Sequence, residues 1–125
     1  MQKFLVFSTN ANLPLSQKIA TLLHISLGKI EIVTFADSEK RVRVEEKVAN
    51  KTVYVIASLS NPVDVNLVEL CLAGDALKSN DCHKLIAVIP YFGYGRQDKQ
   101  HRDGEGVSAR VMARLIEAVG FSKVI

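Results

Sequence analysis

The chain of 125 residues is poor in cysteine, long apolar runs and excess charge. Its only cysteines, Cys71 and Cys82, form no C-x-x-C pair, and Cys82-His83 lacks the several spaced ligands of a zinc site. Two cysteines without a recognisable signal peptide fit a reducing cytoplasm. No apolar run approaches the roughly 20 residues of a membrane span. We therefore expect a cytoplasmic chain with neither a metal site nor a membrane segment.

The charge balance argues against nucleic acid as a partner. Sixteen basic and 13 acidic residues leave a net charge of only +3. Sequence-independent binding to nucleic acid needs a basic surface, and this excess is too small to predict one. A hydrophobic content of 48% and a charged content of 23% lie in the globular range. The length suits one domain, or most of one.

Hydrophobic periodicity alternates between strand and helix along the chain. Short apolar or alternating runs predict strands, and apolar residues at helical spacing predict helices. We expect strands near 4–7, 30–35, 41–45, 53–57, 85–89 and 123–125, and helices near 15–23, 63–79 and 108–119. Gly28 is the expected stop of the first helix, Asn61-Pro62 the start of the second, and Ser108 the cap of the third.

This order predicts a parallel α/β sheet with helices on both faces. The charged and apolar residues of 41–45 alternate, so this strand should pair antiparallel with a neighbour as a small flap. Ligands of such sheets bind at the carboxyl ends of the strands, where we expect residues 35–40 and 90–107. We interpret four charged helix residues as exposed surface: Asp64, Glu69, Arg110 and Arg114. We expect the inner face of the last helix to consist of Val111, Met112, Leu115, Ile116 and Val119.

Residues 90–107 form a connection far longer than the roughly 4–6 residues that are usual. Tyr91 and Tyr94 lie close in sequence to Arg96 and Lys99. Aromatic rings can stack on a purine base while guanidinium and ammonium groups hold phosphates. A solvated basic loop over an aromatic plug has the same composition, so composition alone does not separate the two interpretations.

Two common phosphate-binding motifs are missing. There is no G-x-x-x-x-G-K-(S/T) sequence, which excludes a P-loop nucleotidase. Gly93-Tyr94-Gly95 is followed by Arg96-Gln97-Asp98 and lacks the third glycine of a dinucleotide-binding motif. A prediction of nucleotide binding therefore has to rest on support from residues other than these two motifs.

Two segments supply that support through a resemblance. Residues 89–99, Ile-Pro-Tyr-Phe-Gly-Tyr-Gly-Arg-Gln-Asp-Lys, resemble the I-P-Y-(F/Y)-G-Y-A-R-Q-D-(R/K) stretch of ribose-phosphate diphosphokinases, also called phosphoribosyl diphosphate synthetases. Residues 35–39, Phe-Ala-Asp-Ser-Glu, are similar to that family's F-S-D-G-E. The spacing between the segments and residues 75–78 also look like the family, so the likeness covers essentially the whole chain.

The resemblance implies a phosphoribosyltransferase-like fold and an enzyme that transfers the diphosphoryl group of ATP to ribose 5-phosphate with Mg²⁺. It implies a homo-oligomer in which the nucleotide site is shared between subunits. The implied ATP-binding residues are Phe35, Asp37, Ser38, Glu39, Arg96, Gln97, Asp98 and Lys99. The family's catalytic carboxyl-terminal domain, with its acidic-pair loop, has no counterpart in the 125 residues. Residues 1–125 are thus expected to be an amino-terminal domain, truncated, without catalytic or metal-binding residues and inactive alone.

Three positions depart from the family pattern. Ser38 replaces a glycine, and serine is strained there if the position needs a positive φ. Gly95 replaces an alanine, and Gly104 stands where many bacterial members have arginine, which leaves the phosphate-binding roles of Lys99, His101 and Arg102 open. The alternatives are a non-catalytic regulatory homologue that binds the synthetase, a phosphoribosyltransferase proper, and a generic α/β binding domain.

Overall fold

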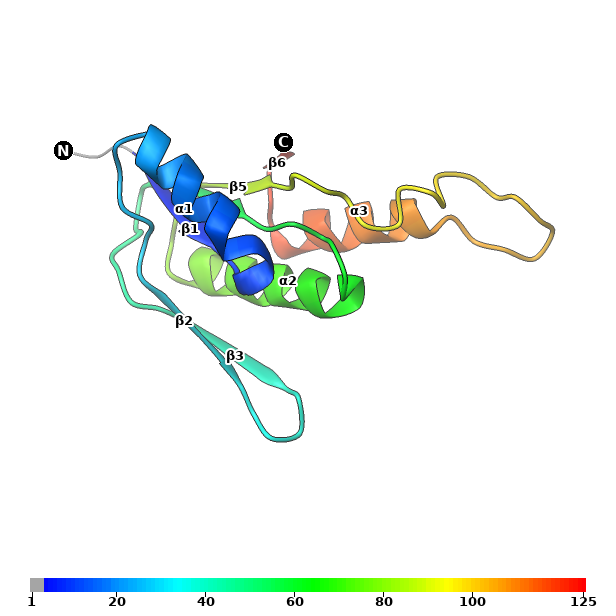
Figure 1. Cartoon of the computed structure of the whole chain (residues 1–125), viewed down its shortest axis with the longest axis horizontal. Coiled ribbons are helices and arrows are strands. Elements are labelled where there is room, and N and C mark those ends of the chain that lie inside the picture. The colour runs from blue at the N-terminus through cyan, green and yellow to red at the C-terminus, as the bar shows by residue number, and fades with distance from the viewer. Residues whose placement is uncertain (1–3) are drawn as a thin grey trace.

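The computed structural model describes residues 4–125, which form a parallel sheet, three α-helices and a separate hairpin (Figure 1). The elements in chain order are β1 (Phe4–Ser8), a 3-10 turn η1 (Asn10–Asn12), α1 (Leu13–Leu22), β2 (Ile30–Thr34), β3 (Lys40–Val44), β4 (Thr52–Ile56), α2 (Val63–Ser79), β5 (Lys84–Val88), α3 (Ser108–Val119) and β6 (Lys123–Val124). The main sheet has the order β1-β4-β5-β6 with every pair parallel. Strands β2 and β3 pair antiparallel with each other. The predicted α/β class with a small antiparallel flap is confirmed.

Successive side chains of each strand point to opposite faces of the main sheet, and both faces are covered. Leu5, Val53 and Leu85 are register partners in three adjacent strands, and all three are at most 3% exposed. They belong to the core cluster that contains Leu70 of α2 and Ile116 of α3. The neighbouring positions face the other way, toward α1. Helices therefore cover both faces, as predicted, with α1 on one and α2 and α3 on the other (Figure 1).

The ends of the helices differ from the predictions. Helix α1 ends at Leu22, before Gly28, and the backbone turns at His24 with a φ of 56°. Gly28 instead donates its N–H to Val6 O at 2.7 Å, and a Cβ there would lie 2.5 Å from the Phe7 ring. The lack of a side chain thus serves a close approach to β1.

The starts of α2 and α3 also lack the predicted side-chain caps. Pro62 occupies the cap position of α2 rather than its first turn, and no side chain caps that helix. Val107 occupies the cap position of α3, and Ser108 is the first helical residue. The Ser108 hydroxyl donates to Gln97 Oε1 at 2.6 Å, and no side-chain oxygen accepts from the first N–H groups of α3. A tertiary contact has replaced the local one.

The inner face of α3 is narrower than its periodicity predicts. Ile116 is 1% exposed, but Val111 and Leu115 are 46% and 45% exposed. Helix α3 packs against α2, and within residues 4–125 the side chains of Val111 and Leu115 are left exposed. The prediction of these two as inner residues is wrong for the described chain.

The β2–β3 hairpin, hereafter the flap, projects from the body of the domain beside α2 (Figure 1). Its turn is residues 35–39, so this segment is not at the carboxyl edge of the parallel sheet as predicted, because β2 pairs only with β3. Lys40 Nζ lies 3.2 Å from Glu69 Oε1 on α2. Glu69 Oε2 accepts from the Asn10 N–H at 2.7 Å. Glu69 is 2% exposed, so its interpretation as helix surface is wrong.

Candidate nucleotide-binding site

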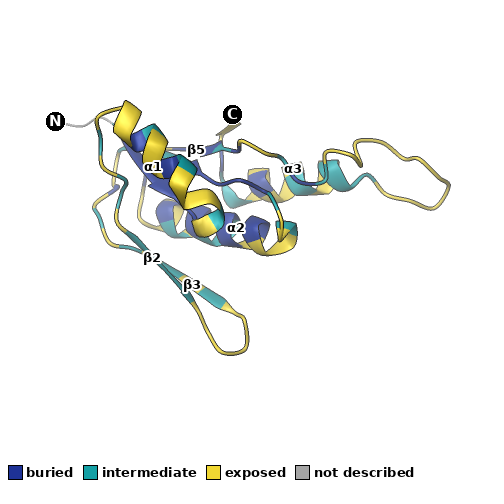
Figure 2. Ribbon diagram, in the orientation of Figure 1, coloured by how far each residue is buried: buried dark blue, intermediate teal, exposed yellow. Residues whose placement is uncertain are grey.

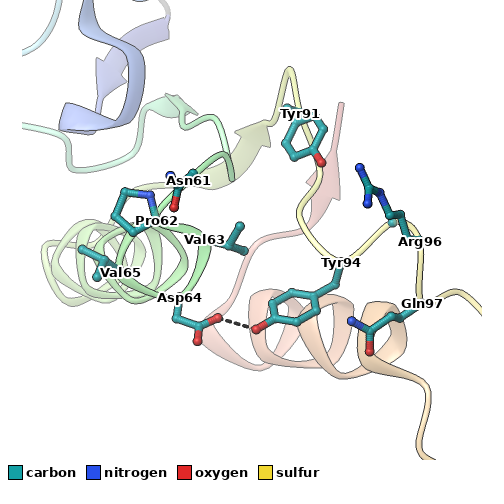
Figure 3. Close-up of a pocket in the computed structure, with 10 residues that line it drawn as sticks. Asn61, Pro62, Val63, Asp64, Val65, Tyr91, Tyr94, Arg96 and Gln97 are labelled. Atoms are coloured by element: carbon teal, nitrogen blue, oxygen red, sulfur yellow. Dashed lines mark hydrogen bonds between the residues drawn. The ribbon is translucent and has the colours of Figure 1, made fainter.

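Residues 90–107 follow the carboxyl end of β5, where the sequence predicts a ligand crevice. The first part of this loop and the start of α2 enclose a hollow of about 610 Å³ (Figure 3). It is lined by residues 61–65 and by Tyr91, Tyr94, Gly95, Arg96 and Gln97. Ligand pockets commonly have volumes of roughly 300–1,000 Å³, so this hollow can hold a nucleotide-sized molecule. We call it the Arg96 hollow.

The inner half of the loop is tied to the domain at both ends. Leu59 donates its N–H to Tyr91 O at 2.8 Å, which extends the contact of β4 with β5 into the loop. Gly93 is buried, and a Cβ there would lie 2.7 Å from Leu59 O. At the other end, Ala109 donates its N–H to Gln97 O at 3.1 Å. Several independent contacts therefore fix the backbone that carries Arg96.

The Arg96 side chain is exposed and extends toward Tyr91 in Figure 3. Within residues 4–125 it has no salt bridge and no side-chain hydrogen bond. By contrast, the side-chain oxygen of the neighbouring Gln97 accepts a hydrogen bond from the Ser108 hydroxyl. Tyr91 is 53% exposed. A free guanidinium beside an exposed ring is suited to an anionic ligand that carries an aromatic base.

The outer half of the loop is exposed along its length (Figure 2). Asp98 and Lys99 lie in this part and are not among the residues that line the Arg96 hollow. Glu105 closes the far turn by accepting from the Arg102 N–H at 2.8 Å, and His101 Nε2 lies 3.3 Å from Arg96 O. Asp98 and Lys99 can meet a ligand only where it extends beyond the hollow.

The other predicted residues gather at the tip of the flap. The Phe35 N–H donates to Glu39 O at 2.7 Å, and the Ser38 N–H donates to Phe35 O at 2.9 Å. Asp37 Oδ1 accepts from the Glu39 N–H at 3.0 Å. The Arg41 guanidinium carbon lies 5.6 Å from the centre of the Phe35 ring. The tip is thus an ordered turn with an exposed aromatic ring and two carboxylates.

Ser38 has a φ of 76°, the positive value that its alignment with a family glycine anticipates. Three-residue hairpin loops place a left-handed residue at this position, usually glycine.

We expect Ser38→Gly to raise the free energy of unfolding by about 1 kcal/mol. Urea denaturation measures the change. The control is Ala36→Gly in the same turn, where φ is not positive and glycine should destabilise. Equal effects of both substitutions would contradict strain at Ser38.

The two groups of predicted residues do not touch within one chain. Ser38 and Glu39 line a second hollow, of about 300 Å³, between the flap and α2. Asp64 and Val65 line both this hollow and the Arg96 hollow, so the first turn of α2 separates the two. The flap tip and the loop tip point in different directions in Figure 1. The structure brings Arg96 and Gln97 together at one hollow, and Ser38 and Glu39 at the other.

Tyr94 and Asp64 form a contact that sequence reasoning missed. The Tyr94 hydroxyl donates to Asp64 Oδ1 at 2.6 Å (Figure 3). This hydrogen bond, then the carboxylate charge, then desolvation raise the pKa of Tyr94. A tyrosine hydroxyl is protonated at neutral pH, so Tyr94 is the donor and the Asp64 carboxylate the acceptor. Thirty positions separate the two residues, and no local pattern relates them.

Within residues 4–125 the structure holds neither a cluster of metal-ligating side chains nor a membrane-spanning helix. Among residues 4–125, no three or more His, Cys, Asp or Glu side chains are grouped so that they could hold a metal ion. Cys71 and Cys82 are free thiols, and burial raises the pKa of both. In the same residues no helix has both the length and the apolar character needed to cross a membrane.

Comparison with known proteins places the fold in a family. Residues 4–120 match the family model described as the N-terminal domain of ribose phosphate pyrophosphokinase. The chain is 41% identical over 120 residues to ribose-phosphate pyrophosphokinase 2 of Enterococcus faecalis, which covers 96% of this chain and 37% of that protein. It is 42% identical over 120 residues to the ribose-phosphate pyrophosphokinase of Thermotoga maritima, covering 96% of this chain and 38% of that one.

A solved structure agrees with these matches. The crystal structure of phosphoribosylpyrophosphate synthetase from Mycobacterium smegmatis superposes with a TM-score of 0.95 at 30% identity. The match covers 98% of this chain and 41% of that one. The chain belongs to the ribose-phosphate pyrophosphokinase family and corresponds to its N-terminal domain. It spans less than half the length of the relatives that it matches.

Proposed function

We propose that this chain forms the ATP-facing part of an enzyme that transfers the diphosphoryl group of ATP to ribose 5-phosphate. The observation that carries the proposal is the free Arg96 guanidinium beside Tyr91 in a hollow at the carboxyl end of β5. Such transfer depends on positioning and on neutralising phosphate charge, and a cation carried on a fixed backbone beside an aromatic ring would supply both. Arg96 and Gln97 would hold the nucleotide in the hollow, with Asp98 and Lys99 meeting its outer end. Magnesium would arrive with ATP.

The flap residues would reach the base from a second copy of the chain. Phe35, Asp37, Ser38 and Glu39 lie on an ordered, exposed turn that is separated from the Arg96 hollow by Asp64 and Val65. The flap projects from the domain, so another subunit can receive its tip (Figure 1). A homo-oligomer would therefore complete a site that one chain leaves in two parts.

The first test is ligand binding by the chain itself. We expect calorimetric titration to detect Mg-ATP and ADP, and to detect ribose 5-phosphate weakly or not at all. The reason is that the free cation and the exposed ring both lie in the Arg96 hollow, while the acidic-pair loop that the family uses for ribose 5-phosphate does not occur in these 125 residues. Tight binding of ribose 5-phosphate without ATP binding would overturn the assignment.

Turnover is a separate test. We expect no sustained AMP formation when the chain is incubated with ATP, Mg²⁺ and ribose 5-phosphate, because the chain matches only the N-terminal domain of the family. The positive control is a full-length relative assayed under the same conditions. Sustained AMP formation by the chain would show that it carries the catalytic groups itself.

A further inference from the structure

The loop that carries Arg96 contains a tyrosine in an unfavourable backbone conformation. Tyr94 has a φ of 67°, a left-handed value that a bulky residue rarely adopts. Such conformations persist where the surroundings over-determine them, and they are common at ligand-binding sites. What holds Tyr94 in place therefore bears on the geometry of the hollow.

The strongest candidate is the hydrogen bond to Asp64. At 2.6 Å it is short, and its acceptor is a carboxylate, which makes it a charge-assisted bond. Asp64 lies in the first turn of α2, a rigid element whose Leu67 and Leu70 are buried in the core. The bond thus ties the inner half of the loop to a fixed point on the opposite wall of the Arg96 hollow.

The backbone transmits this tie to Arg96. Tyr94 O accepts from the Gln97 N–H at 2.9 Å, and this tight turn contains Gly95 and Arg96. A shift of Tyr94 would therefore carry Arg96 with it. Gly93 packs against Leu59 and holds the near side of the turn, and the Ala109 N–H bond to Gln97 O holds its far side. The Tyr94 hydroxyl adds the side-chain tie between these two points.

We propose that Tyr94 and Asp64 form a positioning latch that holds the Arg96 turn against α2 and so sets the affinity of the hollow for ATP. The first part of this proposal, that the hydrogen bond holds the Arg96 turn, is independent of any ligand. The second part, that the bond sets the affinity for ATP, rests on the function proposed above. Neither residue needs to touch the nucleotide. The residues act through the backbone that presents Arg96.

The test uses Tyr94→Phe, Asp64→Ala and the double variant of the 125-residue chain. Each single substitution is expected to weaken Mg-ATP binding by about 5- to 10-fold, as the loss of one hydrogen bond would. The double variant should be no weaker than either single variant, because both remove the same contact. Asp64→Asn keeps an acceptor oxygen and should recover part of the affinity. Tyr54→Phe removes a hydroxyl from a tyrosine on β4, outside the hollow, and is the matched control.

A second measurement separates the latch from the proposed function. Hydrogen exchange of the Gln97 amide reports the turn without any ligand. We expect it to speed up about tenfold in Tyr94→Phe, while the amides of β4 and β5 stay unchanged. If the wild-type chain binds no ATP, the proposed function fails, and the exchange rate alone decides whether the latch holds the turn. If wild type binds ATP and Tyr94→Phe binds equally well, or if the Gln97 amide is unaffected, the latch is overturned.

Discussion

Lys40→Met is expected to lower the free energy of unfolding by about 3–5 kcal/mol, because it leaves the Glu69 carboxylate buried without its cation. The side chains of Lys40 and Glu69 are only 15% and 3% exposed. Glu69 also accepts from the Asn10 N–H, so it cannot turn toward solvent without breaking a second contact. The loss should be measured by urea denaturation of the whole chain.

The next residue supplies a matched control. Arg41 pairs with Glu31 at the same distance of 3.2 Å, but these side chains are 58% and 42% exposed. Exposed pairs contribute roughly 0–1 kcal/mol, so Arg41→Met should have a small effect. The variant Lys40→Met/Glu69→Gln keeps an acceptor for Asn10 without the buried charge, and should recover part of the loss. Equal effects of Lys40→Met and Arg41→Met would refute a special role for the buried pair.

The position of the pair gives it a functional consequence. Lys40 is the first residue of β3 and immediately follows the flap turn, while Glu69 belongs to α2. Lys40 also donates to Thr34 Oγ1 at 3.0 Å across the flap. The pair therefore links the flap to α2 directly beside the turn that presents Phe35 and Glu39.

Arg96→Ala is expected to weaken ATP binding by about 1.5–3 kcal/mol, the usual contribution of a hydrogen bond to a charged group. This corresponds to an increase in Kd of roughly 10- to 150-fold. Arg96 has no salt-bridge partner within residues 4–125, so its substitution should affect ligand binding more than the stability of the fold. Calorimetric titration of the chain with Mg-ATP measures the change.

Two comparisons make this test specific. Arg114→Ala removes the same charge from an exposed position on α3, away from the hollow, and should leave the ATP affinity close to that of wild type. In a full-length family member, substitution of the equivalent arginine should weaken ATP more than ribose 5-phosphate. Equal losses for both substrates would argue that the arginine acts on the whole site rather than on the nucleotide.

Local patterns predicted the architecture because they depend on short-range geometry. Alternating apolar residues in 41–45 and the apolar runs at 53–57 and 85–89 report directly which side chains a strand must bury. The family pattern, with glycine at position 38, raised a positive φ there only as a condition, and the structure shows that Ser38 has one. The site residues themselves were predicted by resemblance, and their contacts with ATP remain predictions.

The sequence by itself determined the order of strands and helices along the chain and the family, because both depend on residues that are neighbours in sequence. The alternation of strand and helix then predicted a parallel sheet, and the alternating residues of 41–45 predicted its flap. Tertiary structure alone decided that Glu69 is buried against Lys40, that Tyr94 reaches Asp64, and that Val111 and Leu115 are left uncovered. These features join residues about 30 positions apart, or depend on which elements pack side by side. No local period encodes such partners, because a helix with the same apolar spacing can meet different neighbours in different folds.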